Sequence, residues 1–150
     1  HTTQPRRKYF LDEVRTEGVP SILHDAASDD RRLAKLGVPF DHPKPLSVAQ
    51  RIVRWFTQDP GDLVLDFFAG SGTTGHAVLA ENRERNAGLQ FLLIQRAEPV
   101  GERSAGRRAG FDTVIQMTRA RLQRAISHMD EDALPSPTED RGFRAERLIE

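Results

Sequence analysis

The sequence predicts an α/β fold around a parallel sheet, because its features follow one another in the order of a βαβ unit. A short apolar run at residues 63–68 ends in a cluster of glycines. A helical pattern follows over residues 72–87, and a second apolar run occupies residues 91–94. Strand, glycine turn, helix and strand form a right-handed crossover between parallel strands. We expect both strands to be buried, because continuous apolar runs are typical of covered parallel sheets.

The composition is that of a soluble, folded chain of one domain. Of the 150 residues, 37% are hydrophobic and 29% are charged, with a mean hydropathy of −0.56. We find no signal peptide and no run near the roughly 18 apolar residues of a membrane span. Cysteine is absent, which excludes disulfides and thiolate metal sites and is typical of the cytoplasm. The 22 basic residues balance 22 acids, so the net charge does not indicate nucleic-acid binding.

The chain before the βαβ unit divides into a polar segment and an amphipathic helix. We expect residues 1–39 to form an arm outside the packed core, with a short helix near residues 29–36, and residues 40–150 to form the main domain. The apolar residues of Leu46–Thr57 recur at helical spacing. Pro45 suits the first helical position of that segment.

Beyond residue 95 the patterns are weaker. A short helix is expected at residues 102–109 and a longer one with an apolar face at residues 111–128. A surface loop with two prolines is expected over residues 130–140, and a third strand over residues 143–149.

The turn between the first strand and its helix is the candidate ligand site, because open parallel sheets bind ligands at the carboxyl ends of their strands. Gly70 and Gly72 allow backbone amides to approach a ligand, and the helix N-terminus offers donors to an anion. Ser71, Thr73 and Thr74 add hydroxyls. No lysine follows, so a nucleoside-triphosphate loop is disfavoured. A dinucleotide site stays open, as does a turn that only packs tightly.

Nine consecutive residues of this turn resemble the motif I loop of the DNA N6-adenine and N4-cytosine methyltransferases: Asp66, Phe67, Phe68, Ala69, Gly70, Ser71, Gly72, Thr73 and Thr74. The resemblance implies that they bind S-adenosylmethionine, with the methionine carboxylate at the backbone amides and hydroxyls. Asp66 then either bonds the cofactor amine or braces the turn. The fold implied is a partial Rossmann-like S-adenosylmethionine-dependent methyltransferase fold, a parallel βαβ core with an N-terminal arm.

A segment just before the first helix of the main domain is similar to another motif of this family. Phe40–Pro45 (FDHPKP) resembles motif X, which lines the cofactor pocket. The resemblance implies that Pro43, Lys44 and Pro45 lie at the cofactor. Lys44 either pairs with the methionine carboxylate or is an ordinary surface lysine.

The end of the second strand departs from the family pattern. Gln95 stands where the family commonly has an acid that binds the ribose hydroxyls. Glutamine accepts only through its carbonyl oxygen, so Glu98 is the other candidate for this role.

Four further segments resemble the Mod subunits of type III restriction–modification systems, which methylate adenine at N6. They are residues 91–99, residues 109–115, the arginine-rich helix that follows them, and residues 141–144. The resemblance implies that the parent enzyme acts on DNA together with a restriction subunit. It also implies that residues 1–39 are the end of the target-recognition region.

The family's catalytic tetrapeptide, an Asp, Asn or Ser followed by two prolines and an aromatic residue, is missing. No Pro-Pro pair occurs in the sequence. We therefore expect a fragment that lacks an N-terminal catalytic half and transfers no methyl group alone. A half-domain leaves an unpaired strand edge and an exposed apolar sheet face, which predicts self-association. The alternative is a non-catalytic binding or assembly module on the same scaffold.

Several other residues favour an ordinary structural role over a functional one. Trp55 is expected in the core or an interface rather than as a base-stacking platform. Arg119, Arg121 and Arg124 are expected on a solvated helix face rather than on DNA phosphates. His76 is expected to be a solvated helix residue rather than a cofactor neighbour, and the histidines show no metal-ligand spacing.

Overall fold

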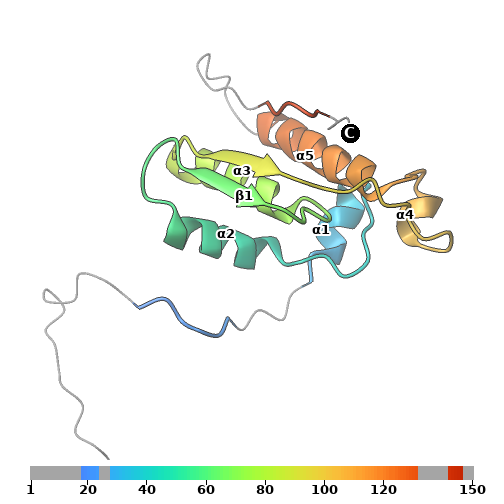
Figure 1. Ribbon diagram of the computed structural model, residues 1–150, viewed down its shortest axis with the longest axis horizontal. Coiled ribbons are helices and arrows are strands. Elements are labelled where there is room, and N and C mark those ends of the chain that lie inside the picture. Colours follow the sequence, from blue (N-terminus) through green and yellow to red (C-terminus); the bar gives the residue numbers. More distant parts are fainter. Residues whose placement is uncertain (1–17, 24–27, 132–141, 147–150) are drawn as a thin grey trace, which may run out of the picture.

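The computed structural model describes residues 18–23, 28–131 and 142–146. Most of the predicted elements are present in the predicted order (Figure 1). They are α1 Asp30–Lys35, α2 Leu46–Phe56, β1 Leu63–Asp66, α3 Thr73–Arg85, β2 Gln90–Leu93, α4 Ala105–Arg108 and α5 Val114–Glu131.

The predictions for the C-terminal part are only partly correct. The third strand, predicted over residues 143–149, is wrong for residues 143–146, which form no strand, and the remaining residues of that prediction lie outside the described part. Most of the predicted loop, residues 132–141, also lies outside it, whereas residues 130 and 131 belong to α5. Among the described residues, no helix is both long and apolar enough to span a membrane.

The two strands pair in parallel, as the βαβ prediction requires. The register runs from Leu63 opposite Gln90 to Asp66 opposite Leu93. The sheet of the described residues has these two strands alone, and together with α3 they form one βαβ unit. α3 connects the strands and lies against one face of the sheet, with α2 and α5 packed against α3 (Figure 1).

The hydrophobic core lies between α2, α3 and the inner face of the sheet. Its buried members come from both helices and from the residue before β2: Leu46, Val53, Ala77, Val78 and Leu89. Val64 and Phe91, one from each strand, pack against this cluster from the sheet. α3 approaches the sheet closely at Gly75, where a Cβ would lie 2.8 Å from Leu93 Cδ1.

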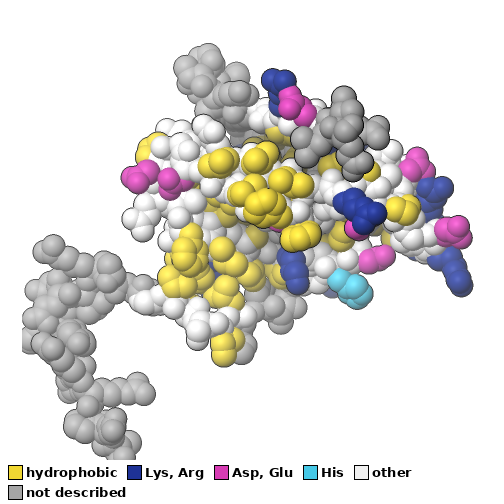
Figure 2. All heavy atoms as spheres, viewed as in Figure 1, with side chains coloured by type: hydrophobic (Ala, Val, Ile, Leu, Met, Phe, Trp, Pro, Cys, Tyr) yellow, Lys and Arg dark blue, Asp and Glu magenta, His cyan; other side chains and the backbone are white. Residues whose placement is uncertain are grey.

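The outer face of the sheet has no covering layer within the described part of the chain. Strand side chains alternate between the faces, and the outward residues are large and apolar. Leu63 is 58% exposed, and Leu65, Phe67, Leu92 and Ile94 are also exposed. Figure 2 shows hydrophobic side chains gathered over the strands. The expectation of fully buried strands is therefore wrong for this face, whereas the expected exposed apolar face is confirmed.

The segment before α2 packs more closely than an arm would. Leu33 in α1 and Val38 after it have no exposed surface. Arg124 of α5 donates to the carbonyl oxygens of Leu36 and Gly37 at 2.7 and 2.6 Å. The expectation that this segment lies outside the core is wrong for these residues, because α5 supplies a surface that covers them. Residues 1–17 lie outside the described part, and the domain division at residue 40 stays a prediction.

Candidate functional site

The glycine loop, Asp66–Thr74, joins the end of β1 to the first turn of α3. Asp66 braces it with both carboxylate oxygens. Oδ1 accepts from the backbone N–H of Phe68 at 2.9 Å, and Oδ2 accepts from the Thr74 hydroxyl at 2.6 Å. These contacts correspond to the bracing role of Asp66, and a bond to a cofactor amine stays a prediction. Phe67 and Phe68 are both exposed, Phe68 by 89%.

Two glycines of the loop have left-handed backbone conformations. Gly70 has a φ of 52° and Gly72 has a φ of 79°. Residues other than glycine rarely adopt this backbone conformation. A Cβ on Gly72 would lie 3.1 Å from Thr118 Cγ2 of α5. Gly72 is therefore required both by its φ and by the close approach of α5.

Gln95, which follows the carboxyl end of β2, supports the loop through its side chain. Its carbonyl Oε1 accepts from the Gly70 N–H at 2.7 Å, and its Nε2 donates to the Arg96 carbonyl oxygen at 3.0 Å. The carbonyl that the ribose prediction depends on is thus already bonded to the loop. Ribose binding by Gln95 or by Glu98, whose side chain is exposed, stays a prediction.

The hydroxyls of Ser71 and Thr73 face inward, toward Arg121 of α5. Both residues are buried, and their hydroxyl oxygens lie 3.1 Å apart. Arg121 Nη1 donates to Ser71 Oγ at 2.9 Å and to Thr73 Oγ1 at 2.8 Å. The loop hydroxyls that suggested cofactor contacts are therefore bonded within the protein, and Thr74 is bonded to Asp66 as described above.

Arg121 is completely buried, so its predicted place on a solvated helix face is wrong. Its Nη2 forms an ion pair with Asp29 Oδ2 at 2.8 Å, and its Nε donates to His76 Nδ1 at 3.3 Å. Burial lowers the pKa of Arg121 to about 10, although Asp29 acts to raise it. The guanidinium stays protonated at neutral pH.

His76 is buried behind the loop rather than solvated, so the expectation for it is also wrong. Burial first, and then the charges of Arg121 and Arg32, lower the pKa of His76 to about 3. The ring is therefore neutral near pH 7. Because Nδ1 accepts from Arg121, its proton is carried on Nε2.

A sequence signal for this buried cluster exists. The buried residues of α5 recur at helical spacing: Met117, Thr118, Arg121, Leu122 and Ala125. Arg121 thus occupies the apolar stripe of its helix, whereas Arg119 lies off it and is exposed. A charged residue on such a stripe needs a buried partner. That partner, Asp29, lies in the segment expected to be an arm, so no local sequence pattern connects it to Arg121.

The motif X segment differs in detail from the prediction. Pro43 is buried and Lys44 is exposed. Pro45 has extended backbone angles and is the N-cap of α2, so the predicted first helical position is off by one residue. The segment lies at the end of the molecule where β1 ends (Figure 1). A role for Pro43, Lys44 and Pro45 at a cofactor stays a prediction.

A network of ion pairs fixes α2 against α3. Glu81 of α3 has no exposed surface and bonds Arg54 of α2 at 2.7 Å and Arg85 at 2.9 Å. Arg54 also reaches Glu84 at 2.6 Å, and Gln50 donates to the same carboxylate at 2.8 Å. These acceptors raise the pKa of Arg54, and the bond from Gln50 contributes most to lowering that of Glu84. The network holds the two helices in one relative position.

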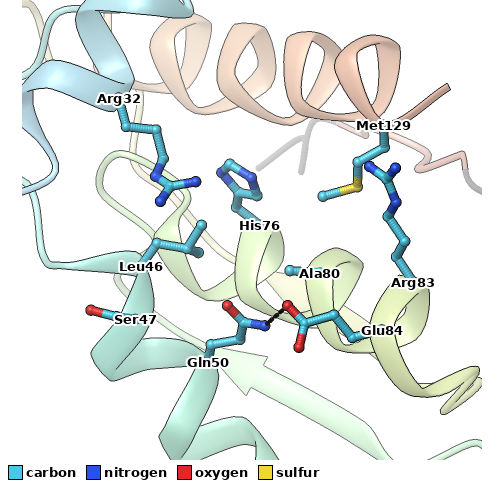
Figure 3. Close-up of a pocket in the computed structure, with 9 residues that line it drawn as sticks. All are labelled: Arg32, Leu46, Ser47, Gln50, His76, Ala80, Arg83, Glu84 and Met129. Atoms are coloured by element: carbon cyan, nitrogen blue, oxygen red, sulfur yellow. Dashed lines mark hydrogen bonds between the residues drawn. The ribbon is translucent and has the colours of Figure 1, made fainter. Parts of the chain in front are cut away.

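A cavity of about 470 Å³ lies between α1, α2, α3 and α5. Arg32, Gln50, His76 and Arg83 are among the side chains that line it (Figure 3). No residue predicted to bind the cofactor lines this cavity. It is therefore separate from the glycine loop. In the described ranges, no three His, Asp or Glu side chains are grouped to hold a metal ion.

These features define a class of protein. It is an α/β chain in which a braced glycine loop connects the carboxyl end of a parallel strand to the N-terminus of a helix. Comparison with known proteins then gives the family. The family model described as DNA methylase matches residues 17–112, and the chain belongs to this family.

The similar proteins include Mod subunits of type III restriction–modification enzymes. The StyLTI Mod subunit of Salmonella typhimurium is 34% identical over 109 residues, which cover 73% of this chain and 16% of that protein. The EcoP15I Mod subunit of Escherichia coli is 32% identical over 111 residues, 74% of this chain and 16% of that protein. The EcoPI Mod subunit of Escherichia phage P1 is 34% identical over 122 residues, 81% of this chain and 18% of that protein. The chain thus spans about a sixth of the length of these relatives.

Proposed function

We propose that this chain is the S-adenosylmethionine-binding portion of a DNA adenine-N6 methyltransferase of a restriction–modification system. The observation that carries the proposal is the loop itself. Asp66 and Gln95 hold it in one conformation at the end of β1. The first helical bond of α3 runs from the His76 N–H to the Gly72 carbonyl oxygen, so the amides of Thr73 and Thr74 have no acceptor within the helix. Such amides and the helix dipole suit a carboxylate.

The contribution of this portion to catalysis is positioning. Methyl transfer to N6 is an in-line attack of the amine on the methyl carbon, with loss of a proton from the amine and departure of S-adenosylhomocysteine. Holding the cofactor so that its methyl group faces the amine lowers the entropic part of the barrier. The sequence contains no Pro-Pro pair for gripping a flipped base. We infer that the chain needs a catalytic half supplied by the parent enzyme.

The exposed sheet face supports the second part of this proposal. Leu63, Leu65 and Leu92 present a contiguous apolar surface that a water-exposed protein seldom maintains. We propose that the catalytic half covers this face in the parent enzyme, and that the isolated chain self-associates through it. Contacts to DNA and to a restriction subunit belong to the parent enzyme under this proposal.

Calorimetry with the isolated chain tests the cofactor. Binding of S-adenosylmethionine and S-adenosylhomocysteine is expected, with no binding of NAD. Asp66→Ala should weaken the binding at least tenfold, because it removes both braces of the loop. Asp59→Ala, in the exposed turn before β1, is the matched control and should leave the affinity unchanged. Binding of NAD alone would overturn the proposal.

A DNA methylation assay tests the need for a catalytic half. The chain alone should transfer no methyl group, and co-expression with the preceding part of the parent reading frame should restore activity. Transfer by the chain alone would contradict this part of the proposal.

A second function is favoured by the same exposed face and the missing tetrapeptide: a non-catalytic assembly module on the methyltransferase scaffold. Absence of binding to all three ligands, together with stable association with the catalytic half, would support it over the first.

A further inference from the structure

The contacts behind the glycine loop assign a role to α5. We propose that Arg121, together with Thr118, is a positioning residue that sets the loop in the conformation needed to receive the carboxylate end of S-adenosylmethionine. This inference rests on the proposed cofactor site and adds to it residues that lie 44 or more positions beyond the loop.

α5 holds several groups of the glycine loop through hydrogen bonds. Thr118 Oγ1 donates to the Gly70 carbonyl oxygen at 2.6 Å, and Arg121 Nη1 donates to the hydroxyls of Ser71 and Thr73 at 2.9 and 2.8 Å. The bonded groups span the turn from its first glycine to the first residue of α3. The Gly70 carbonyl group and the side chains of Ser71 and Thr73 are therefore held from one side.

These bonds also set the direction in which two loop side chains point. The hydroxyls of Ser71 and Thr73 point into the protein, where the Arg121 guanidinium lies beneath the loop. The amides of Thr73 and Thr74, in contrast, have no acceptor within α3. Backbone amides, rather than these hydroxyls, are therefore the groups that meet the ligand.

Arg121 is itself held on the side that faces away from the loop hydroxyls. Asp29 accepts from Nη2 at 2.8 Å, and His76 accepts from Nε at 3.3 Å. The Asp29 carboxylate balances the guanidinium charge, so the pair has no net charge to attract an anion. Arg121 therefore acts through geometry. Two of its four bonds go to the loop and the other two hold the guanidinium itself in place. A rigid planar fork held in this way positions the loop more tightly than a flexible ammonium can.

The test compares two ligands that share adenosine but differ in the amino-acid part. S-adenosylhomocysteine carries the carboxylate, whereas 5′-methylthioadenosine lacks it. In calorimetry with the 150-residue chain, Arg121→Met should weaken S-adenosylhomocysteine at least tenfold and 5′-methylthioadenosine less than twofold. Arg121→Lys should recover part of the loss, because an ammonium can still donate to Ser71, Thr73 and Asp29.

A second variant keeps the test valid if Arg121→Met does not fold. Thr118→Val keeps the side-chain shape and removes the hydroxyl that bonds the Gly70 carbonyl oxygen and, within α5, the Val114 carbonyl oxygen. It should weaken S-adenosylhomocysteine binding about threefold and leave 5′-methylthioadenosine binding unchanged. Arg119→Met, on the exposed side of α5, is the control and should change neither affinity.

Equal weakening of both ligands, or unchanged binding in Arg121→Met and Thr118→Val, would overturn the positioning role while leaving the cofactor site intact. A wild-type chain that binds neither ligand would overturn the proposed function and this inference with it. The two failures are therefore distinguishable.

Discussion

The glycine-loop side and the outer strand face of this protein differ in the surroundings of their side chains. The buried polar groups of the first all have hydrogen-bond partners, whereas the large apolar groups of the second are exposed to water. Behind the glycine loop, Arg121, His76 and Asp29 are charged or polar and buried, and each has bonded partners. Within the described residues, no buried side-chain nitrogen or oxygen lacks a hydrogen bond. On the outer face of the strands the situation is reversed, because Leu63 and Leu92 are apolar and more than half exposed.

The contrast indicates which side is complete. A buried polar cluster is stable only when every member is bonded, so the loop side has all the groups it requires. Covering an exposed apolar face with another surface lowers the free energy, so the strand side would be stabilised by a further layer. Substitutions on the loop side should therefore cost more stability than substitutions on the outer strand side.

Asp29→Asn is expected to have the largest effect. It leaves the buried Arg121 guanidinium without its opposite charge, which should lower the free energy of unfolding by about 3 kcal/mol. Urea denaturation followed by circular dichroism measures the change. Asp41→Asn, an exposed aspartate in the motif X segment, is the control and should change stability by no more than about 0.5 kcal/mol. Equal effects of the two substitutions would show that the buried pair is not important to stability.

Gly75→Ala should be next in size, at about 2 kcal/mol of destabilisation. Alanine is the better helix former, but its Cβ would lie 2.8 Å from Leu93 Cδ1 and 3.0 Å from Leu122 Cδ2. Thermal unfolding compares it with Gly101→Ala, where the nearest atom, Ser104 Cβ, is 4.0 Å away and little change is expected. A stabilised Gly75→Ala variant would show that the inner face is not tightly packed.

Acid should destabilise the loop side through His76. Its pKa is about 3 in the folded protein and near 6.5 when unfolded, so the unfolded chain binds the extra proton between these values. Its contribution to stability is complete above pH 6.5 and falls as the pH drops, by about 1.4 kcal/mol per pH unit.

Replacing His76 by asparagine separates this contribution from that of the carboxylates, because asparagine keeps an acceptor for Arg121 but does not titrate. Urea unfolding between about pH 6 and pH 4 should show a steeper loss for the wild type than for His76→Asn. Parallel curves for the two proteins would mean that His76 is protonated in the folded state.

The outer sheet face should tolerate substitution best. Leu92→Thr keeps a residue suited to strands and should change stability by no more than about 0.5 kcal/mol. It should also reduce the mass of the associated species seen in light scattering. Val64→Thr, on the inner face against the core, should cost more, about 1 to 2 kcal/mol. A larger effect at Leu92 would mean that the outer face is already covered in the isolated chain.

Local sequence determined the order of the elements and the place of the candidate site. The helix at Leu46, the strands at Leu63 and Phe91, and the glycine loop between them all follow from nearest-neighbour patterns, because helical and strand periodicity act over a few residues. The family also followed from contiguous residues, those of Asp66–Thr74.

Only the tertiary structure decided what lies behind the loop. Arg121 is 92 residues from Asp29 and 50 from Ser71, and no local pattern joins positions so far apart. Whether an arginine on a helix is solvated or buried depends on what the other elements place against it. The same holds for the sheet. The sequence determines which strand residues are apolar, but whether they are covered depends on the layers that fold against them. Among the described residues, helices cover one face of the sheet and no element covers the other.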